Sequence, residues 1–465
     1  MRCASSSPDR GTGVATTWFR FLFVGACGLL ASIAAAATST AVEYYHAGFG
    51  HYFVTASPQE IAALDSGSLP GWSRTGESFG VFGLGTAGAA SVCRFWSGQS
   101  YAPKSSHFYT PFAWECTIVK GDPSWQFEGE VFAMNLPDAA GACASGTVPL
   151  YRLYNKFQNG APNHRYTTSL ATRSQMLAQN WVAEGTGIGV IGCVPPAPVT
   201  IVAAGDIAQC HKAPAAASMA ARTAALVTPD DALVLTLGDN AYEFGTPDEF
   251  ANCFGPTWGA FKDRIHPAPG NHDYYTPDAA GYFGYFGAQA GPDRLGYYSF
   301  DFHGWHFISL NSLVDVSEQS QQYLWLQSDL ARSSDSLCTI AYWHYPAFNS
   351  GWTYGSIMAM RPFFDLLYAA GVEMVLSGHE HIYERFAPQR ADGTADTARG
   401  VRQFVVGTGG HDLNLIGTPI PNSEFRQNAN WGILRLTLGV DNYSWQFVPV
   451  GGGVPLDAGT ETCHR

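Results

Sequence analysis

The sequence predicts an α/β (α+β) fold, a β-sandwich flanked by helices, over residues 199–465. An all-β, β-trefoil-like domain is expected before it, over residues 38–195. In the second half, apolar runs typical of buried strands alternate with helical patterns and end in Gly- or Pro-flanked turns that carry Asp, Asn or His. In the first half, one aromatic pattern occurs three times. Between the halves, the Pro-rich residues 195–198 predict a short, stiff linker.

The composition describes a globular protein. Of the 465 residues, 46% are hydrophobic and 14% are charged, so the chain can bury an ample core. The 51 glycines and the 14% of aromatic residues suit a β-rich protein with many turns. The formal net charge of −13 argues against a nucleic-acid scaffold as the main role.

Residues 1–37 are expected to be a signal peptide. Arg20 precedes an apolar run from Phe21 to Ile33, and the four alanines at residues 34–37 suit cleavage by signal peptidase. A lipobox at residues 24–27 is the alternative, although few apolar residues precede Cys27. The run is too short for a spanning helix, and no later segment approaches ~18 uninterrupted apolar residues. We therefore expect a secreted or periplasmic protein that does not span a membrane.

Eight cysteines follow the expected signal peptide, four in each half of the chain. Even numbers of cysteines in an exported protein indicate disulfides. Proximity in the sequence favours a Cys210–Cys253 pair, which would leave Cys338 to bind Cys463 at the tail. Four cysteines allow three pairings in each half, so the connectivity stays open. The first half holds Cys93, Cys116, Cys143 and Cys193.

The repeated pattern begins with an aromatic strand and continues with a His that opens a short stretch ending in Thr. A Trp with Glu and Gly nearby then follows. The three histidines, His51, His107 and His164, are 56 and 57 residues apart. Such self-similarity indicates units that cannot bury their own face alone, and three short-stranded copies favour a closed pseudo-threefold, β-trefoil-like assembly. The pattern resembles a three-repeat module of exported bacterial proteins.

Two interpretations of the three histidines stay open. In the first, each His forms a hydrogen bond at an equivalent strand start and has only a structural role. In the second, the aromatic strands form a platform that binds a polysaccharide or a cell-wall component.

Five apolar runs in residues 199–465 end in polar side chains of the kind that bind metals. Sites in open α/β sheets form off the carboxyl ends of strands, so we expect these side chains to converge. In chain order, the candidate ligands are Asp206, Asp239 with Tyr242, Asn271, His344, and His379 with His381.

This order of residues resembles the calcineurin-like metallophosphoesterase superfamily, and Gly-Asp-x-x-Tyr at residues 238–242 resembles its purple acid phosphatase branch. The resemblance covers about residues 199–440 and implies a metallophosphoesterase β-sandwich with two metal ions bridged by Asp239. A phenolate favours Fe(III) at the first position, and the second position suits Zn(II), Fe(II) or Mn(II). By this resemblance the first metal takes Asp206, Tyr242 and His381, and the second takes Asn271, His344 and His379.

The expected chemistry is hydrolysis by a metal-bound hydroxide, because the metals lower the pKa of a bound water. His272 is expected to contact the phosphate and to protonate the leaving alkoxide, with Asp273 orienting its ring. The alternative is that His272 only braces Asn271. If their stretch were a regular strand, His379 and His381 would share one face.

The sequence departs from the purple acid phosphatase pattern at two places. Ala208 stands where a Gly is usual, and the loop after His344 lacks a further His that those enzymes usually have. Tyr354 lies nearest to that place and is the candidate for binding the phosphate. Four more residues near the ligands in sequence are candidates for supporting them, with purely structural roles as the alternative: Tyr383, Glu384, Arg385 and His411.

The sequence therefore predicts an exported, acid phosphatase-like hydrolase that cleaves phosphomonoesters of small molecules. A phosphodiesterase or nucleotidase with the same site is the alternative among enzymes. An alternative of another class is a glycan- or cell-wall-binding protein whose phosphatase half is inert. Loss of a metal ligand would favour that last interpretation, and no candidate ligand is lost.

Overall fold

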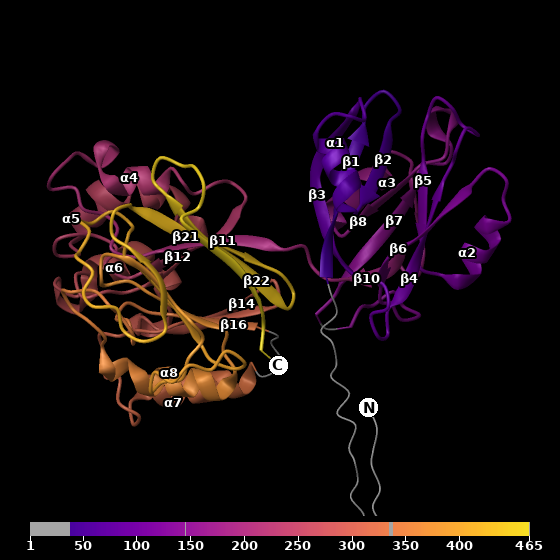
Figure 1. Cartoon of the computed structure of the whole chain (residues 1–465). Coiled ribbons are helices and arrows are strands. Elements are labelled where there is room, and N and C mark those ends of the chain that lie inside the picture. Colours follow the sequence, from indigo (N-terminus) through magenta and orange to yellow (C-terminus); the bar gives the residue numbers. More distant parts are fainter. Residues whose placement is uncertain (1–37, 145, 334–337, 465) are drawn as a thin grey trace, which may run out of the picture. The chain divides into compact units, whose positions relative to one another are not determined.

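The structure, a computed structural model, describes residues 38–144, 146–333 and 338–464 (Figure 1). The expected signal peptide lies outside these ranges. Within them, none of the helices combines the length and the apolar character that a membrane span requires. Two parts are described separately, residues 38–194 and residues 199–464, with the Pro-rich linker between strands β10 and β11.

The N-terminal part repeats one order of elements three times: strand, strand, helix, strand. The helices were not expected from the sequence, although Ser57 and Ser169 cap two of them and Pro58 follows the first cap. The elements are β1 (Thr38–His46), β2 (His51–Thr55), α1 (Pro58–Asp65) and β3 (Trp72–Phe82); β4 (Ala90–Trp96), β5 (His107–Thr110), α2 (Ala113–Lys120) and β6 (Gln126–Met134); and β7 (Val148–Tyr154), β8 (His164–Thr167), α3 (Leu170–Ala178), β9 (Val182–Glu184) and β10 (Val190–Val194).

The strands of this part form two sheets. Six strands pair in the order β2-β1-β3-β6-β4-β5, and β10, β7 and β8 form a second sheet in which β9 also pairs with β7. A closed, trefoil-like arrangement is therefore not confirmed. The first two repeats share a sheet, while the third forms a sheet of its own.

Partly or fully buried arginine–glutamate pairs join the repeats in a cycle. At two junctions, a Glu on the helix of one repeat reaches an Arg on the first strand of the next. At the last junction the charges are exchanged, because the third repeat supplies the Arg and the first repeat supplies the Glu. There the first repeat carries a fully buried Glu. Burial raises the pKa of this Glu, and its Arg partner offsets only part of that rise. The three pairs are Arg94–Glu60 (2.8 Å), Arg152–Glu115 (2.8 Å) and Arg165–Glu43 (2.9 Å).

The three repeated histidines each contact a neighbouring strand or loop. His51 Nδ1 lies 2.7 Å from the carbonyl oxygen of Ser105. His107 Nε2 lies 3.4 Å from Glu128, and His164 Nε2 lies 3.2 Å from Glu184. These contacts fit the structural interpretation of the histidines.

The C-terminal part consists of two mixed sheets packed face to face. The first has the order β13-β12-β11-β21-β22-β23 and the second has the order β14-β15-β16-β17-β19-β18-β20. The strands of the first sheet are β11 (Val199–Ala204), β12 (Asp231–Leu237), β13 (Ile265–Ala268), β21 (Gly432–Leu438), β22 (Asn442–Pro449) and β23 (Asp457–Thr462). Those of the second are β14 (Tyr298–Phe302), β15 (Trp305–Ser309), β16 (Cys338–Tyr342), β17 (Met374–Ser377), β18 (Tyr383–Phe386), β19 (Arg402–Val406) and β20 (Ser423–Gln427).

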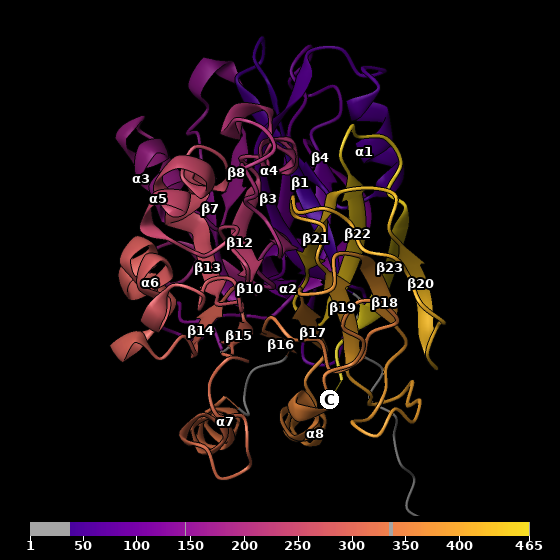
Figure 2. The ribbon, with the colours of Figure 1, turned by 90° about the vertical axis from the view of Figure 1, so that its left-hand side faces the viewer.

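Alternation along the second sheet divides the core in two. Successive residues on a strand point to opposite faces, so Ile340 packs between the two sheets while Ala341 packs on the outer side. Two helices cover that outer side, as Figure 2 shows for α7 and α8 beneath β14–β17. The helices of this part are α4 (Met219–Ala224), α5 (Pro247–Glu249), α6 (Ala280–Phe286), α7 (Gln321–Arg332) and α8 (Arg361–Ala370).

Parallel pairing brings the carboxyl ends of several strands to one edge. Strands β11, β12 and β13 run parallel in the first sheet, and β16 and β17 run parallel in the second. The five turns that carry the candidate ligands follow these five strands, so the sheet topology delivers all of them to one region.

Four disulfides are present in the described residues. Cys210–Cys253 and Cys338–Cys463 confirm the pairs expected for the second half. In the first half, where the sequence left the pairing open, the pairs are Cys93–Cys116 and Cys143–Cys193.

A buried charge pair ties α7 to the second sheet. His306 Nε2 on β15 lies 2.9 Å from Asp329 Oδ2 on α7, and Ser299 Oγ donates to the other carboxylate oxygen at 2.7 Å. Both side chains are about 95% buried, while Asp301, which contacts Nδ1 of the same imidazole, is 75% exposed.

Asp329→Asn should therefore lower the free energy of unfolding by about 2 kcal/mol, because it removes a buried, charged hydrogen-bond partner. Burial opposes both ionised forms, yet pairing raises the pKa of His306 above 6.5 and lowers the pKa of Asp329 below 3.8. The stabilisation from Asp329 is lost as pH falls through its lowered pKa, and that from His306 is lost as pH rises through its raised pKa. Denaturant titrations should show the full loss between pH 3.8 and 6.5 and a smaller loss at pH 9. The control, Asp301→Asn, should change stability far less, and equal effects of the two variants would contradict the assignment.

Candidate metal centre

The carboxylate of Asp239, at the end of β12, lies at the centre of the candidate site. It is 1% exposed. The Tyr242 hydroxyl donates to Oδ2 at 2.9 Å, and His344 Nε2 lies 3.3 Å from the same oxygen. The backbone N–H of His272 donates to Oδ1 at 2.8 Å. One carboxylate thus contacts groups that come from three different turns.

The first group around Asp239 contains Asp206, Tyr242 and His381. The Tyr242 hydroxyl also lies 2.9 Å from Asp206 Oδ1, so its single proton is shared between the carboxylates of Asp206 and Asp239. His381 Nε2 lies 3.3 Å from Asp206 Oδ1 and 3.4 Å from the Tyr242 oxygen. The side chains of these three residues and of Asp239 are each at least 95% buried.

The second group contains Asn271, His344 and His379. His344 Nε2 lies 3.1 Å from Asn271 Oδ1, and one ligand atom from each of Asp239, His344 and His379 falls within 4.8 Å of the others. The structure therefore brings all seven candidate ligands together. Asp239 contacts members of both groups, through Tyr242 in the first and His344 in the second.

Backbone carbonyls orient two of the imidazoles. His344 Nδ1 lies 2.8 Å from the oxygen of Leu237, and His381 Nδ1 lies 2.8 Å from the oxygen of Asp412. With Nδ1 bound to a carbonyl oxygen, Nε2 of His344 faces Asp239 and Nε2 of His381 faces Asp206. Such orientation by an outer partner is usual for histidines that bind metals.

Three candidate ligands have backbone conformations that non-glycine residues rarely adopt. The φ angles of Asp206, Asp239 and His379 are +59°, +49° and +70°. Such conformations cost of order 1–3 kcal/mol each and cluster at functional sites. The stretch around His379 and His381 is a bend rather than a strand. The expected strand alternation is therefore not the reason that these two residues reach different groups.

Glycines leave room for ligands that arrive from neighbouring strands. A Cβ on Gly270 would lie 2.2 Å from Asp239 Oδ1, and a Cβ on Gly378 would lie 2.7 Å from Asp206 Oδ2. A Cβ on Gly238 would lie 2.5 Å from His344 Nδ1. Each of these three glycines is thus required by a ligand on another strand.

The charges of the site suit a bound cation. Burial alone would raise the pKa of Asp239, but the neighbouring His344 and His272 hold it well below its usual range. Burial lowers the pKa of His344, yet Asp239 outweighs this effect and the pKa rises to about 9. Burial and the two carboxylates raise the pKa of Tyr242. Carboxylate, phenol, amide and imidazole donors around two buried acidic groups fit Fe(III), Zn(II), Fe(II) or Mn(II).

His272 lies at the site, but Asp273 does not orient its ring as expected. His272 Nδ1 lies 2.7 Å from the backbone oxygen of Glu243, which leaves Nε2 facing the site at 3.9 Å from Asp239 Oδ2. Asp273 instead accepts hydrogen bonds from the backbone N–H of Gly270 (2.8 Å) and from Asn240 Nδ2 (2.9 Å). Burial and Asp239 raise the pKa of Asp273 to about 7. Its role in the structure is to tie two ligand-bearing turns together.

Tyr354 lies against a candidate ligand. Its ring stacks on that of His379, with centroids 4.0 Å apart and planes inclined by 24°. The residue that holds this loop is Glu380, whose role was not recognised in the sequence. Its fully buried carboxylate accepts hydrogen bonds from Tyr354 N–H, Asn349 Nδ2 and Asn414 Nδ2, each at 2.9 Å.

The other residues considered from the sequence differ in their distance from the centre. The His411 ring packs against that of Tyr242, with centroids 4.2 Å apart and planes inclined by 43°, and its Nδ1 lies 3.0 Å from His381 Nδ1. Tyr383 and Arg385 both bind Asp457, and Glu384 accepts from the backbone N–H of Ser350. His411 therefore lies beside the site, whereas the other three hold neighbouring segments.

Sequence reasoning missed several aromatic residues around the centre. Tyr275 lies 4.6 Å from the His272 ring, and Tyr345 lies 4.4 Å from the His379 ring. Burial raises the pKa of Tyr345 to about 12, and Asp239, Tyr275 and Tyr354 add to this rise. Their positions in the sequence carry no signal, because Tyr and Phe are common throughout the chain.

In a comparison with known proteins, the two parts of the chain match two different families. Residues 196–383 match the calcineurin-like phosphoesterase family, and residues 40–191 match a domain of unknown function, DUF5648. The C-terminal part of the chain thus contains a calcineurin-like metallophosphoesterase domain.

Purple acid phosphatases of plants are among the curated relatives of this chain. Purple acid phosphatase 22 of Arabidopsis thaliana is 36% identical over 141 residues, which cover 29% of this chain and 32% of that protein. Purple acid phosphatase 21 of the same plant is 36% identical over 153 residues, with coverage of 30% and 34%. The chain therefore spans about a third of the length of these relatives. Among solved structures, purple acid phosphatase PPD1 from yellow lupin (Lupinus luteus) seeds aligns with a TM-score of 0.46 and 16% identity, covering 83% of this chain and 72% of that one.

Gly270→Ala should lower metal affinity about 10–100-fold, because its Cβ would displace Asp239 by contact at 2.2 Å. Metal content after dialysis against a graded chelator series measures the effect. The matched control is Gly284→Ala on α6, where a Cβ meets no atom within 4 Å. Wild-type metal retention by Gly270→Ala would show that this contact does not define the site.

Proposed function

We propose that residues 199–465 hydrolyse phosphomonoesters of small molecules at a site that holds two metal ions. The observation that carries this proposal is the buried Asp239 carboxylate shared by two groups of oxygen and nitrogen donors. The family match over residues 196–383 and the purple acid phosphatase relatives support the same reaction class.

Each of the two groups of side chains would hold one metal ion. The first metal would take Asp206, Tyr242 and His381, the second would take Asn271, His344 and His379, and Asp239 would bridge them. The hard phenolate oxygen of Tyr242 suits Fe(III), and the less charged second group suits Zn(II), Fe(II) or Mn(II). When bound, two such ions would supply Lewis acidity and an activated water for attack on phosphorus.

His272 would act on the leaving group. Its Nδ1 faces the carbonyl of Glu243, so Nε2 is the nitrogen that faces the site. In the imidazolium form, Nε2 donates its proton to the leaving alkoxide oxygen as the P–O bond breaks. The hydroxyl of Tyr354 would donate a hydrogen bond to a phosphate oxygen.

The proposed compartment is oxidising, either secreted or periplasmic. The four disulfides support this placement because such bonds persist mainly outside the cytosol. The expected signal peptide supports it as well.

Protein purified from the medium or the periplasm should contain two metal ions per chain and show a visible phenolate–Fe(III) absorption band. It should hydrolyse p-nitrophenyl phosphate faster than the bis ester, because the proposed substrate is a monoester. Asp239→Asn should lower kcat/KM at least about 100-fold and release metal, since it removes the shared charge. The control is Asp365→Asn, at an exposed position on α8.

Different results would contradict different parts of this proposal. A colourless, iron-free and active protein would overturn the Tyr242–Fe(III) assignment. Unchanged turnover in Asp239→Asn would overturn the site itself, and faster cleavage of the bis ester would favour a phosphodiesterase.

His272→Asn should lower kcat/KM about 10²–10⁴-fold for an alkyl phosphate and much less for p-nitrophenyl phosphate. The reason is that p-nitrophenolate leaves readily without a proton. The matched control is His303→Asn, in the exposed β14–β15 turn, where the φ of +51° is tolerated by Asn. An equal loss for both esters would indicate that His272 only braces Asn271.

A further inference from the structure

Two exposed aromatic side chains stand beside His272 and have no role in the chemistry proposed above. Phe244 and Tyr275 are 58% and 56% exposed, and their ring centroids lie 6.5 Å apart. The Tyr275 ring lies 4.6 Å from that of His272, and its hydroxyl lies 3.4 Å from Asn271 Nδ2. We call Phe244 and Tyr275 the first aromatic wall.

A second pair of rings lies against His379. Tyr354 is 45% exposed and stacks on His379 at 4.0 Å, while the half-buried Tyr345 lies 4.4 Å from the same imidazole. We call Tyr345 and Tyr354 the second aromatic wall. Asn271, which Tyr275 contacts, lies with its Oδ1 3.1 Å from His344 Nε2, and the His344 ring lies 5.0 Å from the ring of His379, which the second wall contacts. The two walls thus border the same space.

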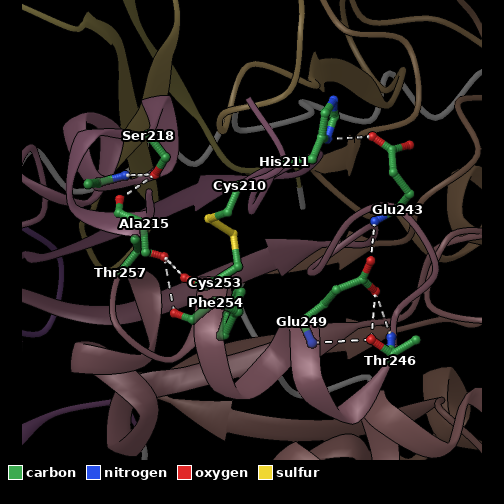
Figure 3. Close-up of a disulfide and its surroundings, with 11 residues drawn as sticks. Cys210, His211, Ala215, Ser218, Glu243, Thr246, Glu249, Cys253, Phe254 and Thr257 are labelled. Carbon is green, nitrogen blue, oxygen red and sulfur yellow. Dashed lines mark hydrogen bonds and ion pairs between the residues drawn. A yellow bond between two sulfur atoms is a disulfide. The ribbon is translucent and has the colours of Figure 1, made fainter. Parts of the chain in front are cut away.

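The backbone holds the first wall in place. The Phe244 N–H donates to Glu249 at 3.1 Å, and its carbonyl accepts from Thr276 Oγ1 at 2.7 Å. Figure 3 shows the Glu249 carboxylate also bound to the backbone of Glu243 and to Thr246. An exposed ring on so well anchored a backbone is presented to solvent in a defined position.

The second wall is anchored in the same way. The Tyr354 N–H donates to the buried Glu380 carboxylate at 2.9 Å. A Cβ on Gly351 would lie 2.0 Å from the carboxyl carbon of Glu380, so a glycine lets this loop close over Glu380. Because the backbone at Phe244 and at Tyr354 is already held, binding between the walls requires little ordering of these loops.

We propose that the two aromatic walls bind the leaving group of the substrate, and that the substrates are phosphoesters whose alcohol carries a planar aromatic ring. This inference rests on the proposed function, because the metal centre is what places the phosphate beside the walls. A flat ring can stack on the faces or edges of these side chains, which a puckered aliphatic ring of similar size does less well. Negative charges on the leaving group gain no attraction from these aromatic side chains, which carry no positive charge.

The test compares benzyl phosphate with cyclohexylmethyl phosphate. Both release a primary alkoxide of similar size, and they differ in the planarity of the ring. We expect kcat/KM of the wild-type protein to favour benzyl phosphate about five-fold. Phe244→Leu and Tyr275→Leu should each bring this ratio toward one, while Tyr275→Phe, which keeps the ring, should preserve it.

The matched control is Trp114→Leu, which removes a 64% exposed aromatic side chain from α2 in the N-terminal part. It should leave the ratio unchanged. Because Tyr275 contacts the candidate ligand Asn271, metal content is measured for each variant. If Tyr275→Leu loses metal, the conclusion rests on Phe244→Leu alone.

Equal kcat/KM values for the two esters, unaffected by Phe244→Leu, would overturn this inference and leave the phosphatase function standing. Failure of the wild-type protein to hydrolyse these esters and p-nitrophenyl phosphate would instead overturn the proposed function.

Discussion

The C-terminal part depends on one constraint, which is that a single buried carboxylate must meet groups from several strand ends at once. Asp239 contacts Tyr242 from its own turn, the backbone of His272 from the turn after β13, and His344 from the turn after β16. Strands β12 and β13 belong to one sheet and β16 to the other. Both sheets must therefore pack in one relative position for the candidate centre to form.

The close approach of these turns explains the residues that precede the ligands. Gly270, Gly378 and Gly238 have no space for a side chain because a ligand from another strand occupies it. The left-handed backbone of Asp206 and Asp239 adds an energetic cost that the surrounding core has to offset. The large apolar cluster shared by both sheets supplies that stabilisation, since strained sites persist only where neighbouring packing determines them.

Carboxylates away from the candidate metals hold the turns in place. Asp273 joins the turns after β12 and β13, Glu380 closes the loop that carries Tyr354, and Glu249 fixes the backbone beside Phe244. The carboxylate oxygens of these three residues accept hydrogen bonds from backbone N–H groups. The site is thus supported by an outer set of acidic residues, and Asp273 belongs to this set instead of orienting His272.

The sequence by itself determined the strands that end in polar side chains and the seven candidate ligands at those ends, and it favoured the pairs Cys210–Cys253 and Cys338–Cys463 without deciding them. The strand ends and their side chains are local features, because a strand end, a flanking glycine and a polar side chain stand within a few residues of one another. Only the tertiary structure decided that Glu243 rather than Asp273 orients His272 and that Glu380 anchors Tyr354. It also placed Phe244 and Tyr275 on one wall and Tyr354 on another. Each of these contacts joins segments far apart in the chain, and strand order and sheet packing, which no local pattern encodes, decide which side chains meet.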